Sequence, residues 1–442
     1  MAGDDKNKVS VAVATAVGLG AIIGAGIYVL SGTAVALAGA DALIAFVIVG
    51  IVAFIVALEL GELGSLMPYV KGASYSYTYN ALGSQLGFIT GMLRYMALAT
   101  SISAISLGFG SYLSSFLGIP IAAYSIPFAI ILIAVLSLVN MLGVKKAAQT
   151  DFGLVIIKIT ILLIFIGFAI FMAATRVHIG PSNFSFDISR GGAAGIFAAS
   201  VVVFFAYSGF QSISTITDKI KNGSSGYVKA IIAAVIISII VYALVVFALL
   251  LMMPAASYKI AADPLSFALK STGAPVWLFS VVDIGALVAT ASATIAMILS
   301  SSRSLYQMST DRLLPKFLRK YDKKNDIATN GIIVSAIIGV AMLFSGNIYI
   351  IASIANFGLM FDYLLIGFDV IHFRRIGSNA PFKMPLYPYL PIIGIIAILV
   401  FFTGMPKIAL VVGVIMILSL IVVYYSLREA REKKVIRIKL FD

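Results

Sequence analysis

The sequence predicts an all-α polytopic membrane protein with twelve transmembrane helices. Two observations lead to this fold class. The 442 residues are 61% hydrophobic and 11% charged, whereas a soluble domain carries about 25% charged residues. The hydrophobic residues also occur in long runs, and a spanning helix needs about 20 predominantly apolar residues. The polar segments between the runs are too short to build a soluble domain.

We interpret twelve runs of the sequence as spanning helices. They are residues 11–37, 41–66, 84–117, 124–143, 150–174, 192–217, 228–254, 276–301, 330–345, 347–371, 389–403 and 406–427. The split between the ninth and tenth runs depends on the short segment SGN, and Pro406 separates the last two. An even number of spans places both ends of the chain on the same side of the membrane.

Basic residues are concentrated on alternate loops. One side holds Lys6, Lys8, Lys71, Lys145, Lys146, Lys219, Lys221, Lys229, the segment from Arg303 to Lys324, Arg374, Arg375, Lys383 and the tail from Arg428 to Lys439, and the other holds Arg176, Arg190, Lys259, Lys270 and Lys407. Since cytoplasmic loops carry the excess of Lys and Arg, we expect a multi-pass protein of the cell membrane with both termini cytoplasmic. The net charge of +13 then reflects topology, so membrane lipid is an expected partner and nucleic acid is not.

The composition also excludes several chemistries. The chain has no cysteine, and His178 and His372 are its only imidazoles, so neither thiolate chemistry nor a histidine-rich metal site is expected. The sequence contains no Walker motif, no HExxH and no candidate Ser-His-Asp set. We therefore expect no enzyme activity and no cofactor.

The first run contains the stretch GLGAIIGAGIYVLSG, Gly18 to Gly32, with five glycines. A dinucleotide fingerprint is rejected because the glycine spacing differs and the stretch lies in a spanning segment. Gly20 and Gly24 form a GxxxG pair, which allows close helix packing. Alternatively, the helix is interrupted near Ile22–Gly26. Unwound backbone inside a membrane exposes amide groups that attract anions and carbonyl groups that attract cations, so such a break suits a zwitterion.

A second interruption is predicted in the sixth run, IFAASVVVFFAYSGFQSIST, from Ile196 to Thr215. Phe205-Ala-Tyr-Ser-Gly209 lies in the middle of this run. If runs one to five and six to ten form inverted repeats, the first and sixth runs occupy corresponding positions. This pairing favours two discontinuous helices over simple glycine packing.

The fifth run carries Lys158, the only charged residue between Asp151 and Arg176. A lysine at the bilayer centre costs about 2.5–3.5 kcal/mol on insertion scales. The side chain could reach the cytoplasmic interface by snorkelling. Alternatively it faces the interior of the bundle, where burial disfavours the charged form and allows the amine to exchange its proton.

Three further stretches accompany the two breaks. They are LELGELGSLMPYVKGASYSYTYNALG (Leu58 to Gly83), SSRSLYQMSTDRLLPKFL (Ser301 to Leu318) and PFKMPLYPYLPIIGI (Pro381 to Ile395). With GAIIGAGIY and FFAYSGF, these motifs resemble the amino acid–polyamine–organocation (APC) family of amino-acid permeases over nearly the whole chain. The resemblance is particularly close to archaeal proton-coupled members of broad specificity.

The resemblance implies a five-plus-five inverted repeat followed by two C-terminal helices. Its parts would be the N-terminal segment 1–10, the first repeat 11–175, the second repeat 190–375, the last two helices 385–427 and the tail 428–442. Helices 1 and 6 would be discontinuous and form the substrate site. The family's carboxylate site corresponds to the amides of Gly24, Ala25 and Gly26, and its ammonium site to the carbonyls of Ile22, Phe205 and Ser208.

The resemblance also suggests a role for Lys158. In sodium-coupled relatives an ion lies between the first broken helix and span 8, and the Lys158 ammonium would take that place. Its partners would be the Gly20 carbonyl and a hydroxyl of Ser292 or Thr294. This implies proton-coupled uptake of amino acids. The alternative is an amino-acid exchanger without ion coupling.

Departures from the family pattern bear on the substrate. Many relatives have an acidic pair and Asn-Pro after span 6, where this chain has Thr217-Asp218-Lys219 and Asn222-Gly223. Since no acidic residue lies beside the second break in the sequence, we expect neutral amino acids. The aromatic residues Tyr28, Phe205 and Tyr207 near the breaks either cover the substrate or serve as packing.

Other charged residues in the runs have no role that the sequence settles. Glu59 and Glu62 are expected at a helix end, as a structural or gating pair or as solvated residues. Asp283, Asp362 and Asp369 could each pair with a cation, and Arg94 could be the partner of one of them.

Overall fold

The computed structural model describes residues 9–68, 74–142, 147–175, 192–213, 220–322 and 327–439. The side chains of Ala25 and of residues 147–152 and 427–439 are outside this description. So are the following parts of the sequence predictions: Lys6, Lys8, Lys71, Lys145, Lys146, Arg176, His178, Arg190, the segment Thr217-Asp218-Lys219, and the side chains of the tail from Arg428.

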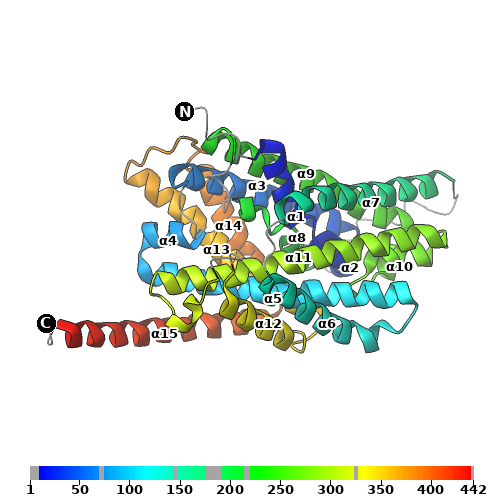
Figure 1. Ribbon diagram of the computed structural model, residues 1–442. Helices are drawn as coiled ribbons and strands as arrows, with labels where there is room; N and C mark the ends of the chain where they lie inside the picture. Colours follow the sequence, from blue (N-terminus) through cyan, green and yellow to red (C-terminus); the bar gives the residue numbers. More distant parts are fainter. Residues whose placement is uncertain are drawn as a thin grey trace.

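The described residues form a bundle of long helices that run roughly side by side (Figure 1). The elements are α1 (Val11–Ile22), α2 (Ala25–Ala38), α3 (Ala42–Leu66), α4 (Ser74–Leu82), α5 (Ser84–Leu117), α6 (Ile121–Met141), α7 (Ala147–Thr175), α8 (Gly192–Tyr207), α9 (Gly223–Met252), α10 (Pro264–Ser271), α11 (Val276–Thr310), α12 (Thr329–Met342), α13 (Ile348–Arg375), α14 (Tyr389–Thr403) and α15 (Lys407–Lys439). The predicted all-α fold class is confirmed.

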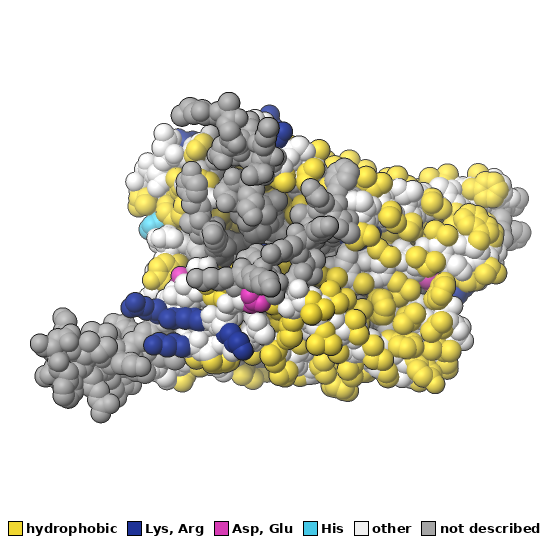
Figure 2. Space-filling model, viewed as in Figure 1, with side chains coloured by type: hydrophobic (Ala, Val, Ile, Leu, Met, Phe, Trp, Pro, Cys, Tyr) yellow, Lys and Arg dark blue, Asp and Glu magenta, His cyan; other side chains and the backbone are white. Residues whose placement is uncertain are grey.

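Length and composition identify the helices that can cross a membrane. Within the described residues, 9 helical segments are long and apolar enough, and α1, α12 and α14 are shorter apolar helices. Together these segments account for all the runs that the sequence predicts. Figure 2 shows hydrophobic side chains over much of the visible face, with most of the visible Lys and Arg side chains toward the end of the molecule that lies on the left of the view.

Some helix boundaries differ from the prediction. The first run is divided into α1 and α2, and in the sixth run α8 ends at Tyr207. The eighth run continues as α11 to Thr310, because a helix can extend past the apolar run into polar residues that give no spanning signal. The short helices α4 and α10 were missed, since neither is long enough to give a spanning signal.

The two ends of the bundle are distinct. The last described turns of α15 and the segment between α13 and α14 lie at one end of the bundle (Figure 1), which we call the terminal end. The segment between α9 and α11, including α10, lies at the other, which we call the opposite end. Between them, α1 packs against α7 and α9, and α2 packs against α8. The two interrupted helices are therefore inside the bundle, where they are surrounded by other helices.

Candidate functional site

The first break separates α1 from α2 at Ile23 and Gly24. The Ile23 amide bonds to the Leu19 carbonyl at 2.6 Å, and the Gly24 amide turns back to the Ile22 carbonyl at 2.8 Å. Gly24 is the N-cap of α2, and no side chain caps that helix. The first amides of a helix lack acceptors within the helix and carry its partial positive charge. The start of α2 therefore has the chemistry of an anion site.

The second break follows α8. Ser208 donates to the Phe205 carbonyl from its amide at 3.1 Å and from its hydroxyl at 2.7 Å. Gly209 has a φ of +119°, and a Cβ atom there would lie 2.6 Å from the Ala21 carbonyl oxygen. Both facts require glycine at this position. The carbonyls at the end of α8 carry the helix's partial negative charge.

The two broken helices touch each other directly. A Cβ atom on Gly26 would lie 2.3 Å from the Cα atom of Ala206, so the backbones of α2 and α8 are in contact. Ile22, Phe205 and Ser208 are 1%, 5% and 8% exposed. The two backbone segments that the sequence proposes as the carboxylate and ammonium sites therefore meet at Gly26 and Ala206.

A tyrosine that the sequence analysis missed joins the two breaks. The Tyr242 hydroxyl, from α9, lies 2.6 Å from the Ile22 carbonyl oxygen and 3.0 Å from that of Ala206. Its ring is 5.0 Å from that of Tyr207 and 6.1 Å from that of Phe46. The last carbonyls of α1 and α8 therefore share one hydroxyl donor.

Lys158 is fully buried on α7. Its Nζ atom donates to the Ser292 hydroxyl of α11 at 2.6 Å and lies 3.4 Å from the Gly20 carbonyl oxygen of α1. The side chain does not snorkel to an interface. Of the two expected hydroxyl partners, the structure places Ser292 beside the amine. The Thr294 hydroxyl instead donates to the Thr290 carbonyl at 2.9 Å and lies 3.5 Å from Ser106 on α5.

Two further tyrosines fix the position of the lysine. Tyr28 of α2 donates its hydroxyl to the Lys158 backbone carbonyl at 2.9 Å. Tyr112 of α5 donates to the Tyr28 carbonyl at 2.5 Å. Tyr28 and Tyr207 both use their hydroxyls to bind neighbouring helices, the latter through the Phe46 carbonyl at 3.1 Å. Both side chains are structural anchors around the breaks.

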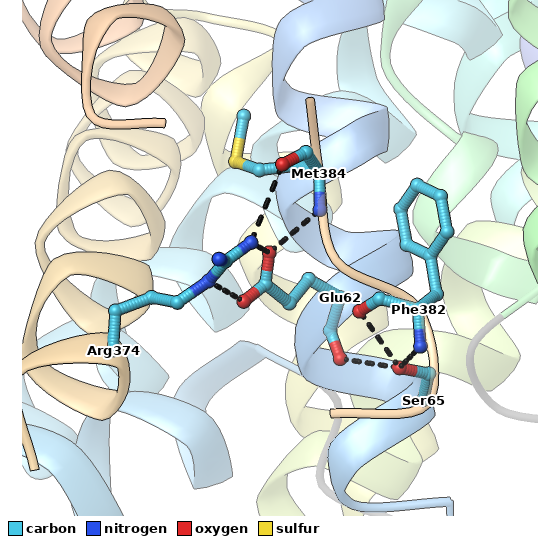
Figure 3. A network of polar contacts seen from close by, with 5 residues as sticks. All are labelled: Glu62, Ser65, Arg374, Phe382 and Met384. Atoms are coloured by element: carbon cyan, nitrogen blue, oxygen red, sulfur yellow. Dashed lines mark hydrogen bonds and ion pairs between the residues drawn. The ribbon is translucent and has the colours of Figure 1, made fainter. Parts of the chain in front are cut away.

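A polar network at the terminal end links α3, α13 and the segment before α14, and we call it the terminal seal (Figure 3). Glu62 of α3 accepts two hydrogen bonds from Arg374 of α13, at 2.5 and 2.8 Å, and a third from the Met384 amide at 2.8 Å. Ser65, one turn further along α3, accepts from the Phe382 amide at 3.1 Å. The network fastens the segment before α14 across the ends of α3 and α13, and Glu62 is not a solvated helix end.

Other buried charges fasten α4 to its neighbours. Arg94 of α5 pairs with Asp362 of α13 at 3.0 Å, and Ser74 of α4 donates to the same carboxylate at 2.8 Å. Thr78 of α4 donates to Asp369 at 2.7 Å. Glu59 is 1% exposed on α3. Of the three aspartates that the sequence offered as partners for Arg94, the structure places Asp362 beside it.

A separate group of charges lies at the opposite end. Lys270 of α10 is 3.8 Å from a carboxylate oxygen of Asp283 on α11, and it donates to the Ser115 carbonyl at 2.6 Å. Burial raises the pKa of Asp263, which precedes α10, to about 6, and the nearby Lys270 partly opposes this shift. These contacts hold α10 against α5 and α11. Among the described residues, no group of three or more His, Cys, Asp or Glu side chains is placed to hold a metal ion.

A bundle of membrane-length helices in which two interrupted helices pack against each other is an arrangement used by membrane transporters. The chain belongs to the amino acid permease family, whose model matches residues 13–432. It is 28% identical to the branched-chain amino acid permease BcaP of Bacillus subtilis, covering 95% of this chain and 92% of that protein. It is 29% identical to the methylthioribose transporter of the same organism, covering 93% and 91%.

A solved structure supports the fold independently. The chain is similar to a crystal structure of a variant of the Eremococcus coleocola manganese transporter, with a TM-score of 0.58 and 16% sequence identity. The similarity covers 97% of this chain and 96% of that one. Both chains therefore share one fold over almost their full lengths.

Proposed function

We propose that the chain is a secondary active transporter that imports amino acids together with protons across the cell membrane. Both termini would be cytoplasmic, so the terminal seal would close the cytoplasmic side. Residues 11–175 and 190–375 would be the two inverted repeats, followed by the helices of 385–427, with 1–10 and 428–442 as the terminal segments. Movement of one repeat against the other would expose the site to each side in turn.

The substrate would lie between the two breaks. The amides of Gly24, Ala25 and Gly26 would bind its carboxylate, since no side chain caps the start of α2 and this helix end favours negative charge. The carbonyls of Ile22, Phe205 and Ser208 would bind its ammonium. An ammonium offers three donors, which suits the carbonyls that gather at the ends of α1 and α8.

Neutral side chains fit the surroundings of the breaks. The Cβ atom of Ala293 lies 3.0 Å from where a Cβ atom on Gly24 would be, and Ile23 and Phe205 are buried apolar neighbours along the chain. The name of one relative, a branched-chain amino acid permease, also favours apolar substrates. We propose a broad specificity for neutral amino acids.

Buried Lys158 is the observation that carries the proposal of proton coupling. Its amine connects α7 to α11 through Ser292 and approaches the Gly20 carbonyl of α1. A charged ammonium binds a carbonyl more strongly than a neutral amine does. Loss of the proton would weaken the link to α1, the cytoplasmic half of the first broken helix, and leave α1 free to move. Proton release would thereby be coupled to opening of the site.

The test is uptake of radiolabelled alanine into proteoliposomes containing the full chain. An inward proton gradient and an inward sodium gradient are imposed separately, with internal alanine present or absent. The proposal expects accumulation driven by the proton gradient and indifferent to sodium. Uptake that requires internal amino acid and ignores both gradients would make the protein an exchanger without ion coupling.

A further inference from the structure

The Tyr242 hydroxyl lies where two helix ends compete for one donor. It is 2.6 Å from the Ile22 carbonyl oxygen and 3.0 Å from the Ala206 carbonyl oxygen. A tyrosine hydroxyl has a single proton to donate. The two carbonyls belong to the last turns of α1 and α8, where carbonyls have no amide partner within the helix. One donor therefore serves two acceptors of the same partial charge.

The environment of this hydroxyl makes the shortage of donors significant. Tyr242 is fully buried, so its hydroxyl is shielded from bulk water. The Ile22 carbonyl accepts a second hydrogen bond, from the Gly24 amide at 2.8 Å. The Ala206 carbonyl is the acceptor in the longer of the two Tyr242 hydrogen bonds. A group with several N–H donors and a positive charge would satisfy these carbonyls better than the hydroxyl.

We propose that the Tyr242 hydroxyl competes with the substrate's ammonium group for the Ile22 and Ala206 carbonyls, and that the ammonium displaces it on binding. The inference rests on the proposed function. It adds the Ala206 carbonyl to the groups that bind the ammonium, and it makes Tyr242 a residue that sets affinity. By tying α1 to α8 when the site is empty, the hydroxyl keeps the two broken helices together between transport cycles.

The test uses the full-length protein purified in detergent, with alanine as the probe. Tyr242→Phe removes the hydroxyl and retains the ring. Tyr227→Phe is the matched control, because Tyr227 is also fully buried on α9 and donates its hydroxyl at 3.1 Å to a carbonyl of α3, Leu60, away from the breaks. Alanine affinity is measured by titration calorimetry, and thermal unfolding is followed with and without saturating alanine.

The expected result is that Tyr242→Phe binds alanine about two- to tenfold more tightly than the wild type, the range given by one net hydrogen bond. Tyr227→Phe should bind alanine with the wild-type affinity. Without alanine, Tyr242→Phe should unfold at a lower temperature than the wild type, and saturating alanine should close that gap. The unfolding temperature of Tyr227→Phe should differ from that of the wild type by the same amount at every alanine concentration.

Two outcomes would overturn the inference alone. Weaker alanine binding by Tyr242→Phe would show that the hydroxyl is a ligand of the substrate, and unchanged affinity would show that it serves packing. If the wild type binds neither alanine nor another neutral amino acid, the proposed function fails and this inference fails with it. The wild-type titration therefore separates the two kinds of failure.

Discussion

The terminal seal and the paired breaks both bury polar groups between helices, but they use different chemistry. The seal joins full charges, with Glu62 and Arg374 side chains 5% and 18% exposed. The breaks join neutral groups, since the hydroxyls of Tyr242 and Ser208 bond to backbone carbonyls. Removing one partner of a buried ion pair leaves an uncompensated charge, whereas one neutral hydrogen bond has a small net value.

This difference indicates which region is built to exchange partners. A hydroxyl on a carbonyl can be replaced by a substrate ammonium at little net cost. The Glu62–Arg374 pair is held by several bonds at once (Figure 3), so it favours two discrete states, formed or broken. We infer that the seal governs opening of the terminal end and that the breaks govern substrate exchange.

The largest expected effect comes from breaking the seal. Arg374→Ala leaves the Glu62 carboxylate buried with the Met384 amide as a remaining donor, and it should lower the free energy of unfolding by about 3 kcal/mol. The measurement is thermal unfolding in detergent. Arg375→Ala is the control, because Arg375 is the next residue along and is exposed.

The double variant Glu62→Ala/Arg374→Ala sharpens this prediction. It removes the stranded carboxylate, so it should recover part of the lost stability. Wild-type stability in Arg374→Ala, or no recovery in the double variant, would contradict the role given to the buried pair.

A smaller effect is expected from separating the two broken helices. Gly26→Ala places a methyl group 2.3 Å from the Ala206 Cα atom, which forces α2 away from α8 and should lower the free energy of unfolding by about 1–3 kcal/mol. Alanine binding should be lost with it. Gly167→Ala on α7 is the control, since its Cβ atom would meet no atom within 4 Å. The control should be as stable as the wild type or more so, and equal stability of both variants would contradict the close contact.

The smallest expected effect comes from Ser208→Ala. The change removes the hydroxyl donor to the Phe205 carbonyl at 2.7 Å and leaves the amide donor at 3.1 Å. The Phe205 carbonyl would then be freer to accept from the substrate, so alanine binding should improve by about two- to threefold. This is less than the effect of a full net hydrogen bond, because the amide donor remains. Ser238→Ala is the control, because that buried hydroxyl bonds to a carbonyl within α9. Weaker alanine binding by Ser208→Ala alone would contradict competition at this carbonyl.

Local patterns predicted much of the fold. Run length and hydropathy were sufficient to predict the spanning helices, and the glycines around Gly24 predicted the break between α1 and α2. The start of the seventh helix was less predictable: α9 begins at Gly223, ahead of the predicted 228, since its first residues are small and polar and give no spanning signal. Length and hydropathy therefore predict which helices exist better than they predict where each one ends.

The polar contacts of the site were harder to predict, because tertiary packing selects the partners. Tyr242 and Tyr227 are both tyrosines of α9, and their sequence contexts do not show which one reaches the breaks. Glu62 and Arg374 are separated by 312 positions, so no local spacing connects them. The Lys158 partners were suggested by resemblance to a family rather than by composition or periodicity.

The most direct test of the central claim compares proton-driven alanine accumulation by the wild type and by Lys158→Ala in proteoliposomes. The control is Ser292→Ala, which removes the hydroxyl at 2.6 Å from the amine and keeps the lysine. The account predicts that the wild type accumulates alanine under an inward proton gradient, that Ser292→Ala does so more slowly, and that Lys158→Ala binds alanine without accumulating it. Full proton-driven accumulation by Lys158→Ala would contradict the assignment of Lys158 as the proton-coupling group.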